Sequence, residues 1–130
     1  MTPELTVLAL VVLLLLVQLG WVATRANLEA GSAWFLSPRD TPGPELSRGT
    51  NRLKRAYANH VEALVPFAAI ALLVAASGQS TGFTAACAWV YLAARLLYVP
   101  AYLYGWNPGR SILYGIGYLA TGLMALAALL

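Results

Sequence analysis

Charged residues are scarce in this chain. Lys, Arg, Asp and Glu make up 10% of its 130 residues and hydrophobic residues make up 60%, whereas an ordinary soluble domain carries about 25% charged residues. A soluble fold of this size would have too little polar surface to cover its exterior. A protein in a bilayer instead needs an apolar exterior and backbone hydrogen bonds that are satisfied internally. The composition therefore predicts an integral membrane protein.

Cysteine and histidine are nearly absent. Cys87 is the only cysteine and lies in an apolar run, which excludes an intramolecular disulfide and a cysteine-rich metal site; we expect it to be a small core residue. His60 is the only histidine and has no second histidine or acidic residue at metal-ligand spacing, so no metal is predicted. The alternating pattern of barrel strands is also missing, which favours an all-α fold.

Four apolar stretches are long enough to cross a bilayer as helices. Leu5 to Thr24 contains 20 residues, which at about 1.5 Å per residue cover a hydrocarbon core of roughly 30 Å. It lacks the Lys or Arg that precedes the apolar part of a cleaved signal peptide, so we interpret it as the first span. The other spans are predicted at about 56–78, 82–104 and 111–130. The chain, 1–130, should form a single four-helix membrane bundle.

Polar segments separate these spans. The first, about 25–55, is rich in charges, Pro, Gly and Ser and is predicted to be a loop. The link at 79–81 is so short that the second and third spans must form an antiparallel hairpin. A turn at 105–110 precedes the last span. Three glycines in that span are available for close helix packing: Gly115, Gly117 and Gly122.

Positive charge is concentrated in the loop 25–55. Six of the eight Lys and Arg residues lie there: Arg25, Arg39, Arg48, Arg52, Lys54 and Arg55. Cytoplasmic loops carry an excess of positive charge, so we expect the loop 25–55 and the turn 105–110, with Arg110, to face the cytoplasm and both termini to face the non-cytoplasmic side. Because these charges lie in a short loop rather than among aromatics on a folded basic surface, no nucleic-acid partner is predicted.

Two ionisable residues lie where lipid makes them costly. Glu62 falls in the second predicted span and Arg95 in the third, and an unpaired charge at the centre of a bilayer costs about 3 kcal/mol or more. Counted from the cytoplasmic ends of two antiparallel helices, the two residues lie at similar depths. We therefore predict that Glu62 and Arg95 form a structural ion pair.

Polar residues also follow helical spacing on these two spans. Arg55, Asn59 and Glu62 are spaced i, i+4, i+7 and share one helix face. The stripe on the third span is Tyr91, Arg95, Tyr98 and Tyr102. Such stripes fit either hydrogen bonding between helices or a ligand site. The polar side chains nearest the cytoplasmic end favour a site for a water-soluble anion. They are Arg55, Asn59, Tyr102 and Arg110.

The residues around Glu62 form a recognisable motif. Residues 55–67 read RAYANHVEALVPF, which closely resembles the motif R-A-x-x-N-x-x-E, followed by a Pro-Phe pair, of the membrane-associated proteins in eicosanoid and glutathione metabolism, the MAPEG family. The residues that resemble the family's second block are Ala94, Arg95, Tyr98, Tyr102, Arg110 and Ser111. The four-span layout extends the resemblance to the whole chain, whose length is typical of bacterial members. It implies a protein of the bacterial inner membrane.

The resemblance also implies a homotrimer that binds glutathione, as co-substrate, between neighbouring subunits near the cytoplasmic face. The residues that would hold glutathione are Arg55, Asn59, Glu62, Tyr98 and Tyr102. Arg110 would be catalytic and lie beside the sulfur, where a guanidinium favours the thiolate of a group with a pKa of about 8.5. The second substrate would be a hydrophobic electrophile that enters from the membrane lipids.

Two functions follow from this resemblance. The first is an enzyme of glutathione-transferase or peroxidase type that conjugates or reduces hydrophobic electrophiles. The alternative is a non-catalytic membrane subunit of the same fold, with an assembly or lipid-binding role in a larger complex. Two departures speak against an eicosanoid synthase: Ala58 stands where some of those members carry Arg, and Tyr98 replaces a histidine of the prostaglandin branch.

Overall fold

The computed structural model describes residues 1–40 and 42–130. Its long helices are α1 (Pro3–Ala30), α3 (Arg48–Ala76), α4 (Gly82–Leu103) and α5 (Gly109–Leu129), and α2 (Ser32–Leu36) is a short helix after α1. All four long helices are long and apolar enough to cross a membrane. The predicted all-α, four-span fold is confirmed.

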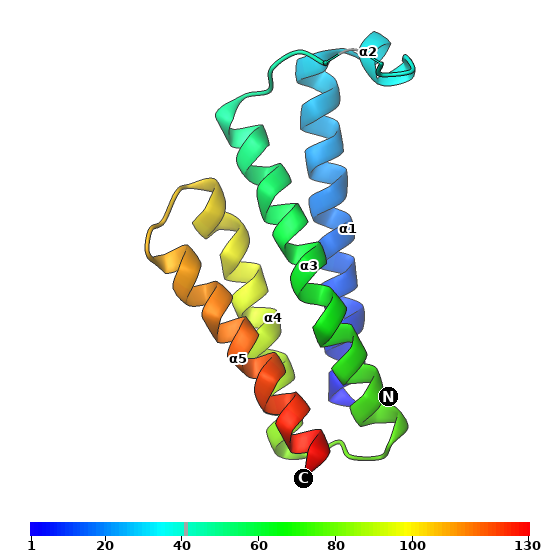
Figure 1. The fold of residues 1–130 in the computed structure, drawn as a ribbon, viewed down its shortest axis with the longest axis vertical. Helices are drawn as coiled ribbons and strands as arrows, with labels where there is room; N and C mark the ends of the chain where they lie inside the picture. Colours follow the sequence, from blue (N-terminus) through cyan, green and yellow to red (C-terminus); the bar gives the residue numbers. More distant parts are fainter. Residues whose placement is uncertain (41) are drawn as a thin grey trace.

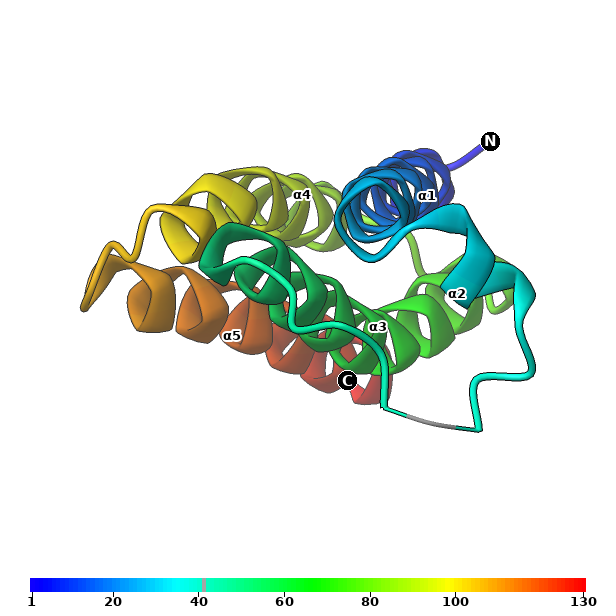
Figure 2. The ribbon, with the colours of Figure 1, turned by 90° about the horizontal axis from the view of Figure 1, so that it is seen from above.

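The long helices run up and down along one axis (Figure 1). Both termini and the link between α3 and α4 lie at one end, which we call the terminal end. The segments 31–40 and 42–47 and the turn 104–108 lie toward the other, which we call the loop end. Seen from above, α4 and α1 lie side by side across from α5 and α3 (Figure 2). The most extensive packing is between α4 and α5 and between α1 and α3.

The helices α1 and α3 extend further toward the loop end than the sequence predicted. A loop was expected over 25–55, but α1 continues to Ala30 and α3 begins at Arg48. Gly31, with φ of 90°, ends α1, and the Ser47 side chain caps α3 by accepting a hydrogen bond from a backbone N–H. Lys and Arg are good helix formers, so a change to charged composition marked the edge of the apolar region rather than the end of the helix.

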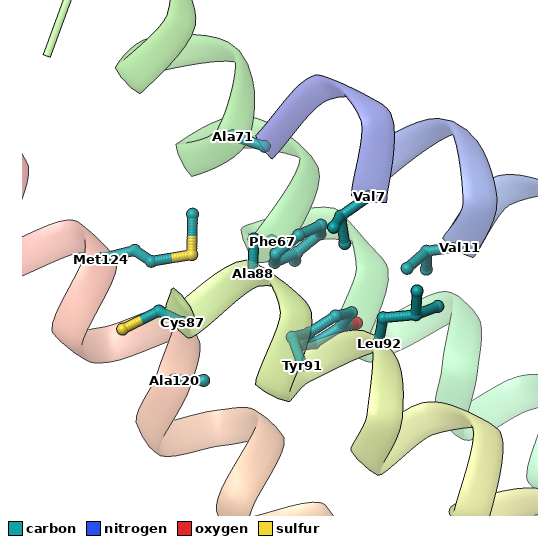
Figure 3. Close-up of a cluster of buried hydrophobic side chains, with 10 residues drawn as sticks. All are labelled: Val7, Val11, Phe67, Ala71, Cys87, Ala88, Tyr91, Leu92, Ala120 and Met124. Atoms are coloured by element: carbon teal, nitrogen blue, oxygen red, sulfur yellow. The ribbon is translucent and has the colours of Figure 1, made fainter. Parts of the chain in front are cut away.

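All four long helices contribute to one buried apolar cluster in the half of the bundle nearer the terminal end (Figure 3). Phe67 of α3 and Tyr91 of α4 stack at its centre, with ring centroids 4.0 Å apart and planes within 2°. Gly117 of α5 faces this stack, since a Cβ there would lie 3.5 Å from the Tyr91 ring, in ordinary van der Waals contact, whereas Gly115 and Gly122 face open space. Cys87 belongs to the cluster, which confirms it as a core residue.

Polar side chains are buried with partners between the helices. Glu4 of α1 is fully buried and accepts hydrogen bonds from Ser80 Oγ, at 2.8 Å, and from Thr84 Oγ1 of α4. Gln18 of α1 is hydrogen-bonded to His60 of α3, and both are buried. These contacts attach α1 to α4 and to α3, and they give His60 a structural role.

Candidate functional site

A hollow of about 250 Å³ opens at the loop end between α3, α4 and the start of α5. Its lining residues are Arg52, Arg55, Tyr102, Gly105, Asn107 and Arg110. Half of them are arginines, and none of the described residues that line it is acidic. We call this site the basic hollow. Such a concentration of guanidinium groups on one concave surface is suited to bind an anion.

Tyr102, in the last turn of α4, holds two of these arginines together. Its hydroxyl accepts a hydrogen bond of 3.1 Å from Arg55 Nε. The guanidinium carbon of Arg110 lies 4.9 Å from the centroid of the same ring, and that of Arg55 lies 5.8 Å from it. Cation–π contacts at exposed sites contribute about 0.5–1 kcal/mol each. The aromatic ring therefore keeps two like charges close enough to act on one ligand.

Arg52 is a member of the basic hollow that the sequence reasoning did not single out. Its Nη1 donates a hydrogen bond of 3.1 Å to the backbone carbonyl of Leu103, at the C-terminal end of α4, where the helix dipole favours a cation. Gly105, with φ of 69°, packs against the same guanidinium. Arg52 precedes Arg55 by three residues, and that spacing on one helix face could have identified it.

Further into the bundle, Arg95 contacts Asn59 and Tyr98, which were both predicted to belong to the site. It is 2% exposed, and its Nη1 donates a hydrogen bond of 2.9 Å to Asn59 Oδ1. Its guanidinium carbon lies 4.3 Å from the centroid of the Tyr98 ring, and that ring lies 5.7 Å from the ring of Tyr102. Asn59 and Tyr98 are therefore connected to the basic hollow through contacts between side chains.

Glu62 does not form the predicted ion pair with Arg95. Between described residues, the ion pair in the structure is that of Arg25 and Glu29, at 3.9 Å. The prediction took about residue 56 as the start of the second span and counted the depth of Glu62 from there. Because α3 begins at Arg48, Glu62 lies further from the loop end than that count assumed, and Asn59 is closer to the depth of Arg95.

A second, mostly apolar cavity of about 370 Å³ lies between α3, α4 and α5. Glu62 and Arg95 are on its wall, together with Pro66, Tyr91 and Tyr114. We call it the apolar cavity. Within residues 1–40 and 42–130, no group of three or more His, Cys, Asp and Glu side chains is placed to hold a metal ion. The chemistry that the two cavities offer comes from guanidinium, phenol, amide and carboxylate groups.

Comparison with known proteins identifies the family. The MAPEG family matches residues 4–130, which is essentially the whole chain. Among curated proteins, none matches it. The family match covers all four long helices and the side chains that meet at the loop end, and it agrees with the resemblance carried by the motif at 55–67. The chain therefore belongs to the MAPEG family, and its fold is of the membrane glutathione-transferase type.

Proposed function

We propose that this protein is a membrane-bound enzyme of glutathione-transferase type that conjugates or reduces hydrophobic electrophiles with glutathione. The observation that carries the proposal is the convergence of Arg55 and Arg110 on Tyr102 in the basic hollow. Glutathione has two carboxylates, and guanidinium groups bind carboxylates through charge-assisted hydrogen bonds. A hollow that places arginines around a phenol ring suits this ligand.

Each remaining predicted residue would have a distinct role in binding glutathione. Asn59 and Tyr98 offer an amide and a phenol next to the basic hollow, and Arg95 holds both. Glu62 would accept a hydrogen bond from the ammonium group of glutathione. Together with Arg55 and Tyr102, these side chains complement a ligand that carries both signs of charge.

Arg110 would act on the sulfur. A free thiol has a pKa of about 8.5, so a neighbouring guanidinium raises the fraction of thiolate at neutral pH. In conjugation, the sulfur electron pair forms a carbon–sulfur bond and the leaving group departs with its own bonding pair. The apolar cavity would hold the electrophile, so that the two reactants meet in one orientation.

We further propose that the working form is a homotrimer with the loop end at the cytoplasmic face of the inner membrane of a bacterium. Glu62 supports this assembly, because it is exposed on the single chain although it lies within a helix that can span a membrane. A carboxylate at that depth is costly in lipid. A neighbouring subunit and bound glutathione would cover it.

Calorimetric titration of the detergent-purified protein with glutathione tests this function, together with ultraviolet detection of thiolate near neutral pH. We expect saturable binding and a thiolate signal that disappears in Arg110→Ala. Arg48→Ala is the matched control, since it removes one exposed charge at the same end of the bundle outside the basic hollow. A folded oligomer that binds no glutathione would contradict the proposal and favour a non-catalytic membrane subunit in a larger complex.

A further inference from the structure

Arg95 contacts Asn59 and Tyr98, two of the residues proposed to bind glutathione, but it does not line the basic hollow itself. We infer that Arg95 is a positioning residue, which fixes the side-chain amide of Asn59 so that its NH₂ group faces glutathione. This inference rests on the proposed function and assigns Arg95 an indirect part in binding.

The orientation of Asn59 follows from the chemistry of its partner. A guanidinium has five N–H donors and no acceptor, so the atom of Asn59 that faces it must be the carbonyl oxygen. Arg95 Nη1 lies 2.9 Å from Asn59 Oδ1. The NH₂ group of the amide then points away from Arg95 and keeps both of its donors for a ligand. Two donors held in this way suit a carboxylate or a carbonyl group of glutathione.

The guanidinium of Arg95 is itself held in place. Its central carbon lies 4.3 Å from the centroid of the Tyr98 ring, and Tyr98 is 3% exposed. A planar guanidinium stacked on an aromatic face has little freedom to rotate. Arg95, which is fixed on α4, therefore holds the side chain of Asn59 on α3 in one orientation. Glutathione would bind to an amide that is already oriented.

A role in stability alone does not explain this arginine. Arg95 Nε and Nη2 are buried, and neither has a hydrogen-bond partner among the described residues. Leaving buried donors without partners is unfavourable. A buried charge without an oppositely charged partner is strongly destabilising. A guanidinium at this position is better explained by what it does to Asn59.

A double-mutant cycle on glutathione affinity tests the inference. Arg95→Gln removes the constraint, because an amide both donates and accepts and no longer dictates which way Asn59 points. We expect Arg95→Gln and Asn59→Ala each to weaken glutathione binding about tenfold, the size expected for a hydrogen bond to a charged group. In the Asn59→Ala background, Arg95→Gln should change the dissociation constant by less than about twofold, since coupled residues are non-additive.

Arg95→Lys provides a second test, which also applies if Arg95→Gln does not fold. Lysine has only donors, so it should keep the orientation of Asn59 and bind glutathione within about threefold of wild type. Thr84→Val is the control, since Thr84 is buried on the same helix at the terminal end; it should lower the melting temperature without changing affinity.

The outcomes separate the two proposals. If wild-type protein binds no glutathione, the proposed function fails. If wild type binds but Arg95→Gln weakens binding equally in both backgrounds, or leaves affinity unchanged in a folded oligomer, the positioning role of Arg95 is wrong. The same conclusion follows if Arg95→Lys binds as weakly as Asn59→Ala.

Discussion

The two ends of the bundle differ in whether their charged side chains are buried or accessible. At the terminal end, Glu4 is fully buried and its carboxylate accepts hydrogen bonds from the hydroxyl groups of Ser80 and Thr84. At the loop end, Arg55 is exposed, Arg110 is half-buried, and both face a concave surface shared with Arg52. The terminal end buries its carboxylate, whereas the loop end places several guanidinium groups on an open concave surface.

From this difference we expect a structural role for the buried charge at the terminal end and a ligand-binding role for the charges at the loop end. Glu4 has its acceptors occupied and no access to solvent, so its contribution is the attachment of α1 to α4. The arginines at the loop end share one hollow with no acidic residue among its described lining residues, and their mutual repulsion falls when an anion binds. We therefore expect substitutions at the terminal end to change stability and substitutions at the loop end to change ligand binding.

The largest expected effect is that of Arg110→Ala on catalysis. Removing one group that stabilises developing charge lowers kcat by about 10²–10³-fold in other enzymes, and we expect a similar loss in conjugation of a small chloronitroaromatic electrophile at saturating glutathione. The melting temperature should not change, because the side chain lies at the basic hollow rather than in the core. A loss of less than about tenfold would contradict a role for Arg110 at the sulfur.

The second effect concerns stability at the opposite end. Glu4→Leu removes the carboxylate that accepts hydrogen bonds from the hydroxyl groups of Ser80 and Thr84, and it should lower the free energy of unfolding by about 2 kcal/mol. The folded fraction should bind glutathione with wild-type affinity. Thermal unfolding in detergent measures the first quantity and calorimetry the second. Glu45→Leu is the control, because Glu45 is an exposed carboxylate on the loop. Equal destabilisation by both variants would contradict the proposed difference between the two ends.

Arg55→Ala should weaken glutathione binding about tenfold, because it removes one cation and the hydrogen bond to the Tyr102 hydroxyl. Its neighbour Lys54 is also an exposed cation but lies outside the basic hollow, so Lys54→Ala should change the dissociation constant by less than about twofold. Titrations at low and high salt add a further check. Salt should weaken binding less in Arg55→Ala than in wild type, since one screened interaction is gone.

The smallest expected effect is that of Tyr102→Phe. Phenylalanine keeps the ring against which Arg110 packs, at 4.9 Å, and loses only the hydroxyl that accepts from Arg55. We expect glutathione affinity to fall by about threefold, which corresponds to the loss of one partly exposed hydrogen bond. Tyr102→Leu removes the ring as well and should have the larger effect. If the two variants were equal, the ring would not hold the arginines together.

Several features of the site could be predicted from spacing. Arg55 and Asn59 lie one helical turn apart, and the structure connects both to tyrosines of α4, directly or through Arg95. The Glu62–Arg95 pair was not predicted correctly, because it depended on where α3 begins, and Ser47 caps that helix well before the apolar region starts. Spacing identifies the residues on a face, whereas the register between two helices depends on their true ends.

The sequence by itself determined that this chain crosses a membrane as four helices with both termini at one end. Lipid offers no partner to a backbone N–H or carbonyl, so apolar stretches of this length have helix as their stable form. Only the tertiary structure decided that Arg95 contacts Asn59, that Arg52 joins the basic hollow, and that Gly117 rather than Gly115 or Gly122 packs on Tyr91. These contacts depend on the axial offset and rotation of helices that are far apart in the chain, and those are set by how their side chains pack together.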